Sequence, residues 1–440
     1  MNFPYMELIL DENINYEENF RVNKNIKKLI SSNTLAPNFF QVPNIPKAEH
    51  NPTTLNLNRS ETAANPTLYL FHSNVSRAFP QWLESLPFPC YPPDKYDQVD
   101  KFRYGIQFVK IHKCASSTSS GIAQRIAHRH GEIASTGTGK RTCRVQFKHE
   151  SARMRKYKLR DTKKSFLWSI VREPTSRWIS EFYHFKIARN RRYKSFGPPE
   201  LDVVMREELD VVMREELNNI TNYSNTGVMM ESLATTLIER TAFLPMYEKE
   251  HRMQNNRVLE KIIQEILDDY NFIGTKERLD ESLVLLRLLL GLDAGDIMYL
   301  SSKTSGGYDG GGSKAGCALI PKPHISEQTK QLFTDERWLQ YTYEDRILYE
   351  AVNRSIDKTI KSVGVDRFGK ALNEHRHLMA LANEECFPTA IFPCSERGEK
   401  QITEAEKNCY WNDNGCGYPC LDKLAKIWEG RGKLQQPYNL

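Results

Sequence analysis

Two short apolar runs, each ending in polar and basic residues, constrain the fold of this chain most strongly. GIQFVKI at 105–111 is apolar and β-branched, as in a buried strand, and it leads directly into HKCASSTSS. FLWSIV at 166–171 is a second such strand, which ends before Pro174. Helical spacing follows each strand, at 121–130 and at 175–194. This alternation predicts an α/β domain with a mainly parallel sheet.

Further elements continue the alternation along the chain. The tandem repeat ELDVVMRE, at 200–207 and again at 208–215, keeps its apolar positions at helical spacing and lengthens one exposed helix. The remaining predicted elements are a helix at 257–270, a short strand at 271–275, an amphipathic helix at 277–291 that Gly291 terminates, and a helical stretch from Ser326 to about Ile360.

The length of 440 residues suits one large domain or two ordinary ones. Hydrophobic residues make up 40% and charged residues 26%, values that exclude a collagen-like, coiled-coil or wholly disordered chain. We predict three parts: an Asn- and Pro-rich stem or weakly ordered arm at 1–95, the α/β domain at 96–375, and a Cys-rich C-terminal extension at 376–440.

The net charge of +6 is small for this length, but the charge is unevenly placed. Residues 125–164 hold thirteen Lys and Arg against three Asp and Glu. Such a concentration suggests an anionic ligand, and a solvated basic loop region is the alternative.

The first polar cluster stands where a strand turns into a helix. Backbone N–H groups at a helix start point at an anion, and the helix dipole favours its binding. Lys113 adds a mobile positive charge, and the hydroxyls of 116–118 add donors. The cluster is not a Walker A loop, because Cys114 and Ala115 separate the lysine from the hydroxyls. By itself, the small-residue run would also suit a helix N-cap.

The second cluster, in SIVREPTSRWISEF, places Arg172 at a strand end and Ser180 eight residues later in the next helix. The guanidinium of arginine offers a fork of donors that matches phosphate oxygens. An Arg–Glu surface pair is the alternative interpretation. The two clusters in this order are more specific than either alone.

Cysteines and glycosylation sequons indicate an oxidising compartment. Five of the nine cysteines fall in the last 55 residues, in a Pro-, Gly- and Asn-rich segment that reads as a disulfide-stapled subregion: Cys386, Cys394, Cys409, Cys416 and Cys420. A zinc site is the weaker alternative, because no Cys-x2-Cys pair is present. Five Asn-x-Ser/Thr triplets begin at Asn58, Asn74, Asn219, Asn222 and Asn353. The given sequence has neither a signal peptide nor a run of about 18 apolar residues, which conflicts with this compartment.

The paired motifs carry a family resemblance. The chain resembles the Golgi membrane-bound carbohydrate sulfotransferases that use 3′-phosphoadenylyl sulfate (PAPS). IHKCASST resembles their 5′-phosphosulfate loop and IVREPTSRWISEF their 3′-phosphate motif. FIGTKERLDESLVLLRLLLGLDAGDIMYL is similar to the galactose-3-O-sulfotransferase and galactosylceramide sulfotransferase group. The resemblance covers about residues 104–360 and implies a P-loop-like three-layer α/β domain. Ala115 stands where the family usually has Gly, and Ala can present its N–H there if its φ is negative.

The resemblance implies transfer of a sulfuryl group from PAPS to a hydroxyl of a glycan or glycolipid, without a metal. It assigns Lys113 to the leaving oxygen, and Lys113, Cys114, Ala115, Ser116, Ser117 and Thr118 to the 5′-phosphosulfate, with Arg172 and Ser180 on the 3′-phosphate. It also implies no nucleic-acid partner and a type II membrane protein of the Golgi lumen, whose anchor is not present in the 440 residues.

Two further assignments come from related sulfotransferases. His149, between the two motifs, resembles a histidine general base, and a neutral imidazole accepts a proton near pH 7. The rival bases are His112, which we expect to pack behind the loop, and Glu150, Glu181 and His184. The Gly-rich loop at 305–316 contributes Ser313 and Lys314 to the 3′-phosphate site, unless it is simply a flexible surface loop.

Two other functions remain open at this point. The first is a P-loop-type kinase using ATP, against which the missing Gly-Lys-Ser/Thr argues. The second is a catalytically silent glycan-binding module of the same fold, against which the intact Lys113 and paired motifs argue.

Overall fold

The computed structural model describes residues 73–82, 88–90, 103–134, 143, 145–218, 228–235, 249–301, 306–309, 316–401 and 408–435. All of them belong to one compact unit, Tyr69–Leu440. Most of the predicted stem lies outside the described residues.

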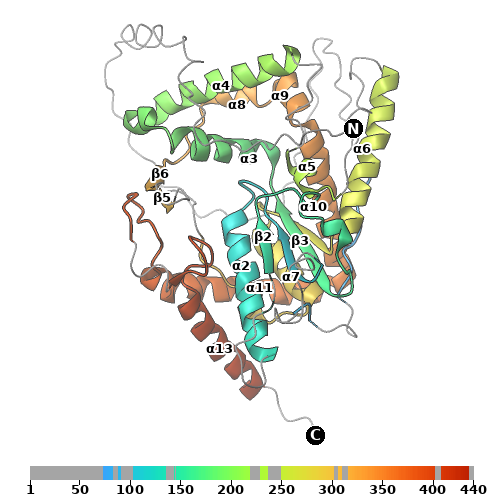
Figure 1. Ribbon diagram of the computed structural model, residues 1–440, viewed down its shortest axis with the longest axis vertical. Coiled ribbons are helices and arrows are strands. Elements are labelled where there is room, and N and C mark those ends of the chain that lie inside the picture. The colour runs from blue at the N-terminus through green and yellow to red at the C-terminus, as the bar shows by residue number, and fades with distance from the viewer. Residues whose placement is uncertain are drawn as a thin grey trace, which may run out of the picture. The chain divides into compact units, whose positions relative to one another are not determined.

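A four-stranded parallel sheet organises the described part of the chain (Figure 1). Its strands are β1 (Gly105–Val109), β2 (Val145–Lys148), β3 (Ser165–Val171) and β4 (Phe272–Thr275), in the order β2-β1-β3-β4. Every neighbouring pair is parallel, which confirms the predicted α/β class. The sequence did not predict the edge strand β2, because VQFK is short and half polar.

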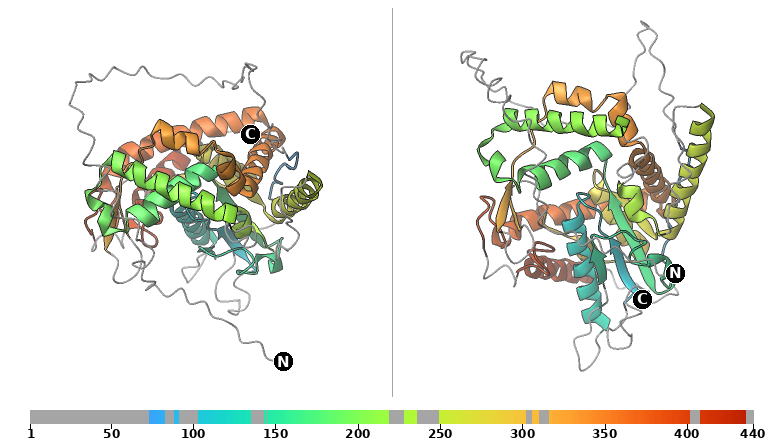
Figure 2. Two further views of the ribbon diagram at one scale, coloured as in Figure 1. Left: turned by 90° about the horizontal axis from the view of Figure 1, so that it is seen from above. Right: turned by 45° about the horizontal axis from the view of Figure 1, so that its top comes forward.

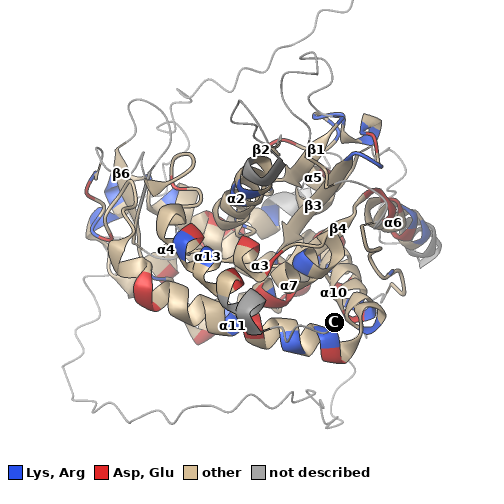
Figure 3. Cartoon of the chain, turned by 90° about the horizontal axis from the view of Figure 1, so that it is seen from below, with Lys and Arg blue, Asp and Glu red and all other residues tan. Residues whose placement is uncertain are grey.

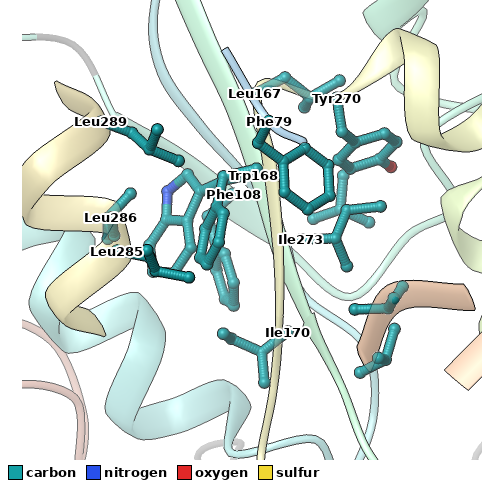
Figure 4. Close-up of a cluster of buried hydrophobic side chains, with 14 of the residues drawn as sticks. Phe79, Phe108, Leu167, Trp168, Ile170, Tyr270, Ile273, Leu285, Leu286 and Leu289 are labelled. Carbon is teal, nitrogen blue, oxygen red and sulfur yellow. The ribbon is translucent and has the colours of Figure 1, made fainter. Parts of the chain in front are cut away.

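The two central strands are buried on both faces, as strands of parallel sheets are. Figure 4 shows the leucines of α7 (Leu279–Leu290) against Trp168 on one face of β3, with Phe79 and Tyr270 on the other side. The rings of Phe108 and Trp168 lie 4.5 Å apart between centroids. Layers of side chains on both faces give the three-layer arrangement expected of this fold.

The helices follow the predicted pattern with four differences. The helix predicted at 257–270 begins eight residues earlier, at Lys249. The helix after β1 begins at Ser116, five residues before the predicted start at Gly121. The helix predicted over 175–194 changes to a π-helix after Glu181. The stretch from Ser326 is three helices, because Ser326 caps the first and Asp335 caps the second.

The bounds of the helices and of the second, two-stranded sheet complete the element order. They are α2 (Ser116–Ala134), η4 (Tyr157–Leu159), α3 (Pro174–Glu181), the π-helix η5 (Phe182–Ile187), η6 (Arg191–Ser195), α4 (Pro198–Asn218), α5 (Val228–Leu233), α6 (Lys249–Asp269), α7, η8 (Ala294–Ile297), β5 (Gly306–Asp309), β6 (Cys317–Ile320), α8 (Glu327–Leu332), α9 (Glu336–Tyr341), α10 (Tyr343–Val363), α11 (Val365–Glu385), η9 (Phe387–Thr389) and α13 (Tyr418–Gln435).

The tandem repeat forms α4, as predicted, but this helix is not exposed all round. Leu201, Met205, Leu209 and Met213 are buried in a cluster that contains Trp178 and Trp338. Their spacing of four residues puts them on one face, so the repeat doubles the length of an amphipathic helix.

Part of the segment that precedes the sheet packs against the core. Phe79 is 1% exposed, and its backbone N–H donates to Thr359 Oγ1 at 2.9 Å. A disulfide joins Cys90 to Cys143 just before β2. The boundaries of the three predicted parts remain a prediction.

Disulfides staple the C-terminal extension, as its composition predicted. Cys386 pairs with Cys420, and Cys409 with Cys416. The fifth tail cysteine, Cys394, pairs outside the tail with Cys317 of β6. Since all five sulfurs are in disulfides, none is a thiolate ligand for zinc. The extension packs through α13 and η9 on α11 and η8, and its loops lie beside α2 in the views of Figures 1 and 2.

Some basic residues of the segment 125–164 form ion pairs within the protein. Arg125 Nε lies 2.8 Å from Asp422 Oδ1, and Arg129 Nε lies 2.6 Å from Asp296 Oδ1. Elsewhere, Figure 3 shows cationic and anionic residues interspersed along α4, α6 and α11. Arg129 also pairs through Nη2 with Glu429 of α13. Both arginines therefore hold the extension through α13, and their charges do not serve a ligand at the strand ends.

Candidate active site

The carboxyl ends of the four parallel strands border a cavity of about 550 Å³. Each strand delivers one cavity-lining segment: His149 follows β2, Lys113 follows β1, Arg172 follows β3, and Lys276 follows β4. Ligands of open parallel sheets bind outside these strand ends. The structure therefore brings both sequence motifs and His149 into one cavity.

The turn after β1 contains two residues with left-handed backbone. Lys113 has a φ of 63° and Ala115 a φ of 54°, with the buried Cys114 between them. Ser116 starts α2, and the hydroxyl residues 116–118 line the cavity. A helix start with unpaired N–H groups beside a lysine can hold a phosphate. The side chain of Cys114 points into the core, where its Sγ lies 3.8 Å from Met229 Sδ, so its assigned role rests on its backbone alone.

The condition set for Ala115, a negative φ, is not met, because its φ is 54°. A residue with a Cβ pays about 1–2 kcal/mol in this region, which glycine does not. The family's usual glycine therefore has a physical reason here, and the alanine holds the same turn with strain.

Lys113 lies in a desolvated and positively charged setting. Burial, followed by the neighbouring Arg172 guanidinium, lowers the pKa of Lys113 to about 8. At neutral pH its ammonium group is still mostly charged. A partly desolvated cation interacts strongly with any negative charge that develops nearby.

Arg172 joins the two motifs directly. Its Nη1 donates to the Lys113 carbonyl oxygen at 3.1 Å, and its Nε lies 3.8 Å from Glu277 Oε1. Glu173 caps α3 by accepting from the N–H groups of Thr175 and Ser176, and Ser180 of this helix lines the cavity. The fork of Arg172 and the hydroxyl of Ser180 thus face one space.

His149 has a defined tautomer. Its Nδ1 lies 3.0 Å from the Lys110 carbonyl oxygen, which can only accept, so Nδ1 carries a proton, and in the neutral ring the lone pair is on Nε2. The ring stacks on His112, with centroids 3.8 Å apart and planes 7° apart. His112 was expected to pack behind the loop, but it is exposed and lines the cavity. Desolvation lowers the pKa of His112.

The other predicted base candidates differ in their placement. His184 is buried and lines the cavity from the π-helix. Glu181 accepts a hydrogen bond from Arg177 Nη1 at 2.7 Å, and Glu150 forms an ion pair with Arg155. Ser313 and Lys314 lie outside the described residues.

The sequence reasoning missed the segment after β4 and two more distant elements. Glu277, Arg278, Asp280 and Glu281 line the cavity, with Tyr299 and Arg376. Tyr299 donates from its hydroxyl to Asp280 Oδ1 at 3.3 Å. The His375 imidazole, 3.6 Å from the same oxygen, holds the pKa of Asp280 below its usual range. The strand FIGT was predicted, so its carboxyl end could have marked this segment, whereas no sequence signal pointed to Arg376.

The described residues lack two further features. No group of three or more His, Cys, Asp and Glu side chains there is placed to hold a metal ion. No helix in the same part of the chain is long and apolar enough to cross a membrane.

Comparison with known proteins agrees with this geometry. A comparison with curated proteins finds no match for the chain. A family model described as the Sulfotransferase family matches residues 99–350, which include all four strand ends of the cavity. The match covers more than half of the 440 residues, and the chain therefore belongs to the sulfotransferase family, whose members transfer sulfuryl groups.

Proposed function

We propose that this chain transfers a sulfuryl group from PAPS to a hydroxyl of a glycan or glycolipid, with the 3-hydroxyl of galactose as one acceptor. The observation that carries the proposal is the order in which polar and charged side chains follow one another along the carboxyl ends of the strands. His149 stands at β2, Lys113 at β1, Arg172 at β3 and Asp280 after β4. This order suits a donor that extends from β4 to β1, with its acceptor on the β2 side.

The donor site is supported by charge and by hydrogen-bond donors. Arg172 and Ser180 suit the 3′-phosphate, and the start of α2 with its three hydroxyls suits the 5′-phosphosulfate. The segment after β4 places the carboxylates of Glu277 and Asp280 beside the same cavity, where they suit the hydrogen-bond donors of the nucleoside. The Arg278 guanidinium is held by Glu281 and Asp357. The proposed chemistry uses no metal ion.

In the proposed reaction the acceptor oxygen attacks sulfur in line with the leaving group. The new O–S bond forms as the bond from sulfur to the bridging oxygen of the 5′-phosphate breaks. That oxygen gains negative charge, which the ammonium group of Lys113 stabilises. As in phosphoryl transfer, positioning and electrostatics supply most of the rate enhancement.

The acceptor hydroxyl must lose its proton during this step. His149 suits the role of base, because the Lys110 carbonyl fixes its proton on Nδ1 and leaves the lone pair on Nε2. The released proton then resides on Nε2 until product leaves.

Transfer of labelled sulfate from PAPS to a panel of galactosides, other glycans and glycolipids tests the proposal, with labelled ATP as a second donor. We expect transfer from PAPS alone, and calorimetric binding of 3′-phosphoadenosine 5′-phosphate. A protein that neither binds this nucleotide nor sulfates any acceptor would overturn the proposal, and phosphate transfer from ATP would favour a kinase.

We also propose that the protein works in the oxidising lumen of the secretory pathway, as a membrane-associated Golgi enzyme of type II topology. Four disulfides and the exposed sequon at Asn74 support the compartment. Imaging of the tagged full-length chain with a Golgi marker tests the location, and cytosolic staining would contradict it.

A further inference from the structure

The C-terminal extension contains an exposed tryptophan on a closed loop. Trp411 lies in the loop that the Cys409–Cys416 disulfide closes, and it is 51% exposed. Asn414 N–H donates to the Trp411 carbonyl, and Tyr410 N–H donates to the Asn414 carbonyl, both at 3.0 Å. A bulky apolar side chain thus reaches solvent from a backbone that is held in place.

The loop is fixed on the helix that starts at the phosphosulfate turn. Gly415 lies so close to Gly121 of α2 that a Cβ on Gly121 would come within 2.3 Å of the Gly415 nitrogen. Tyr410 stacks on Tyr418 with centroids 4.2 Å apart, which ties the loop to α13. Rigid presentation reduces the entropy lost when a surface side chain binds a ligand.

Trp411 stands close to the acceptor end of the cavity by two routes. Its ring contacts Phe147 of the edge strand β2, with centroids 5.8 Å apart, and His149 follows two residues later. Two strand residues span roughly 7 Å. By the second route, Gly121 lies five residues, or about 7.5 Å along the axis, from the helix start at Ser116.

We propose that Trp411 forms an outer subsite that stacks against a sugar ring of the acceptor saccharide, beyond the ring that is sulfated. The proposal rests on the proposed function, and it gives the Cys-rich extension a role in acceptor recognition. The apolar C–H face of a pyranose matches an indole face, and the indole N–H is left for a sugar hydroxyl. An edge strand that ends at the base places this surface on the acceptor side of the sheet.

The occupant is an extended saccharide because Trp411 lies outside the cavity, on the strand that leads to the cavity-lining His149. A single sugar bound at His149 would not reach Trp411, because the Trp411 ring contacts β2 two residues before His149, at Phe147. Chains of two or more sugars would engage both places, and this linkage raises affinity without a new contact at the reaction centre.

A glycan array carrying galactose-, N-acetylgalactosamine- and uronate-containing mono-, di- and tetrasaccharides tests the proposal with full-length protein. Trp411→Ala should lose about 3- to 10-fold in affinity for tetrasaccharides but not for monosaccharides. Trp411→Tyr should recover most of the loss, because it restores an aromatic face. Phe387→Ala is the matched control, since Phe387 is an aromatic residue of the same extension and is 45% exposed.

The proposal is overturned if Trp411→Ala binds every chain length as the unmodified protein does, if it loses all lengths equally, or if the unmodified protein binds no saccharide. Nucleotide binding is measured in parallel to show that each variant is folded. If the unmodified protein neither binds 3′-phosphoadenosine 5′-phosphate nor sulfates any acceptor, the result contradicts the proposed function. If the unmodified protein transfers sulfate and Trp411→Ala has the same array profile, the result contradicts only the Trp411 subsite.

Discussion

Substitution of Gly121 by alanine sets two physical effects against each other. In a helix interior, replacing glycine with alanine stabilises by about 1 kcal/mol through helix propensity alone. At this position, however, the new Cβ would lie 2.3 Å from the Gly415 nitrogen and 2.7 Å from its Cα. Both atoms are backbone within a disulfide-closed loop, so they cannot turn away as a side chain would. Overpacking costs about 1–3 kcal/mol, and such short approaches belong at the upper end. We therefore expect net destabilisation of about 2 kcal/mol.

Urea denaturation under non-reducing conditions measures this effect, and Gly369→Ala provides the control. Gly369 lies within α11, and a Cβ there meets nothing within 4 Å, so its replacement should stabilise the protein by about 1 kcal/mol. The reasoning is refuted if the two variants are stabilised alike. If the proposed donor site is right, Gly121→Ala should also weaken nucleotide binding, because the displaced loop packs on α2, whose first residues line the cavity.

Four further outcomes are expected. Lys113→Ala should abolish sulfate transfer yet keep the circular dichroism of the unmodified protein, and near-normal turnover would refute its role. Because burial lowers the pKa of Lys113 to about 8, turnover should fall as pH rises through 8, and in Lys113→Arg the pH–rate profile should lose this fall. Ala115→Gly should raise the free energy of unfolding by up to about 1 kcal/mol, since it removes left-handed strain that exceeds the entropy cost of glycine. Asn74→Gln should remove one N-glycan by mass, whereas Asn353→Gln should remove none, because Ser355 of its sequon is fully buried in α10.

The sequence was sufficient to predict the parts of the fold that local pattern determines. The runs 105–111 and 166–171 became β1 and β3, because continuous β-branched apolar sequence suits strands buried on both faces. Gly291 terminates α7 with a φ of 72°, as a helix-ending glycine should. In both cases the determining interactions lie within a few residues along the chain.

Other features depend on contacts between distant segments, which no local pattern reveals. β2 is recognisable only from its pairing with β1, since its four residues carry no clear period. The Cys317–Cys394 disulfide spans 77 residues, and five tail cysteines alone could not indicate a partner in β6. The position of His112 depends on ring contacts with His149 and Phe185, which are distant in the sequence.

The order of the strands explains why the sequence predicted the two motifs after β1 and β3 but not the contacts around β2. β1 and β3 are central and buried on both faces, so the turns that follow them are held rigidly. Their apolar runs, which end in polar and basic residues, can be recognised in the sequence. β2 is an edge strand, covered in part by a loop from the far end of the chain through Phe147 and Trp411. Under the proposed function, we therefore expect acceptor specificity to depend on β2 and on the disulfide-linked C-terminal segment that contacts it through Trp411.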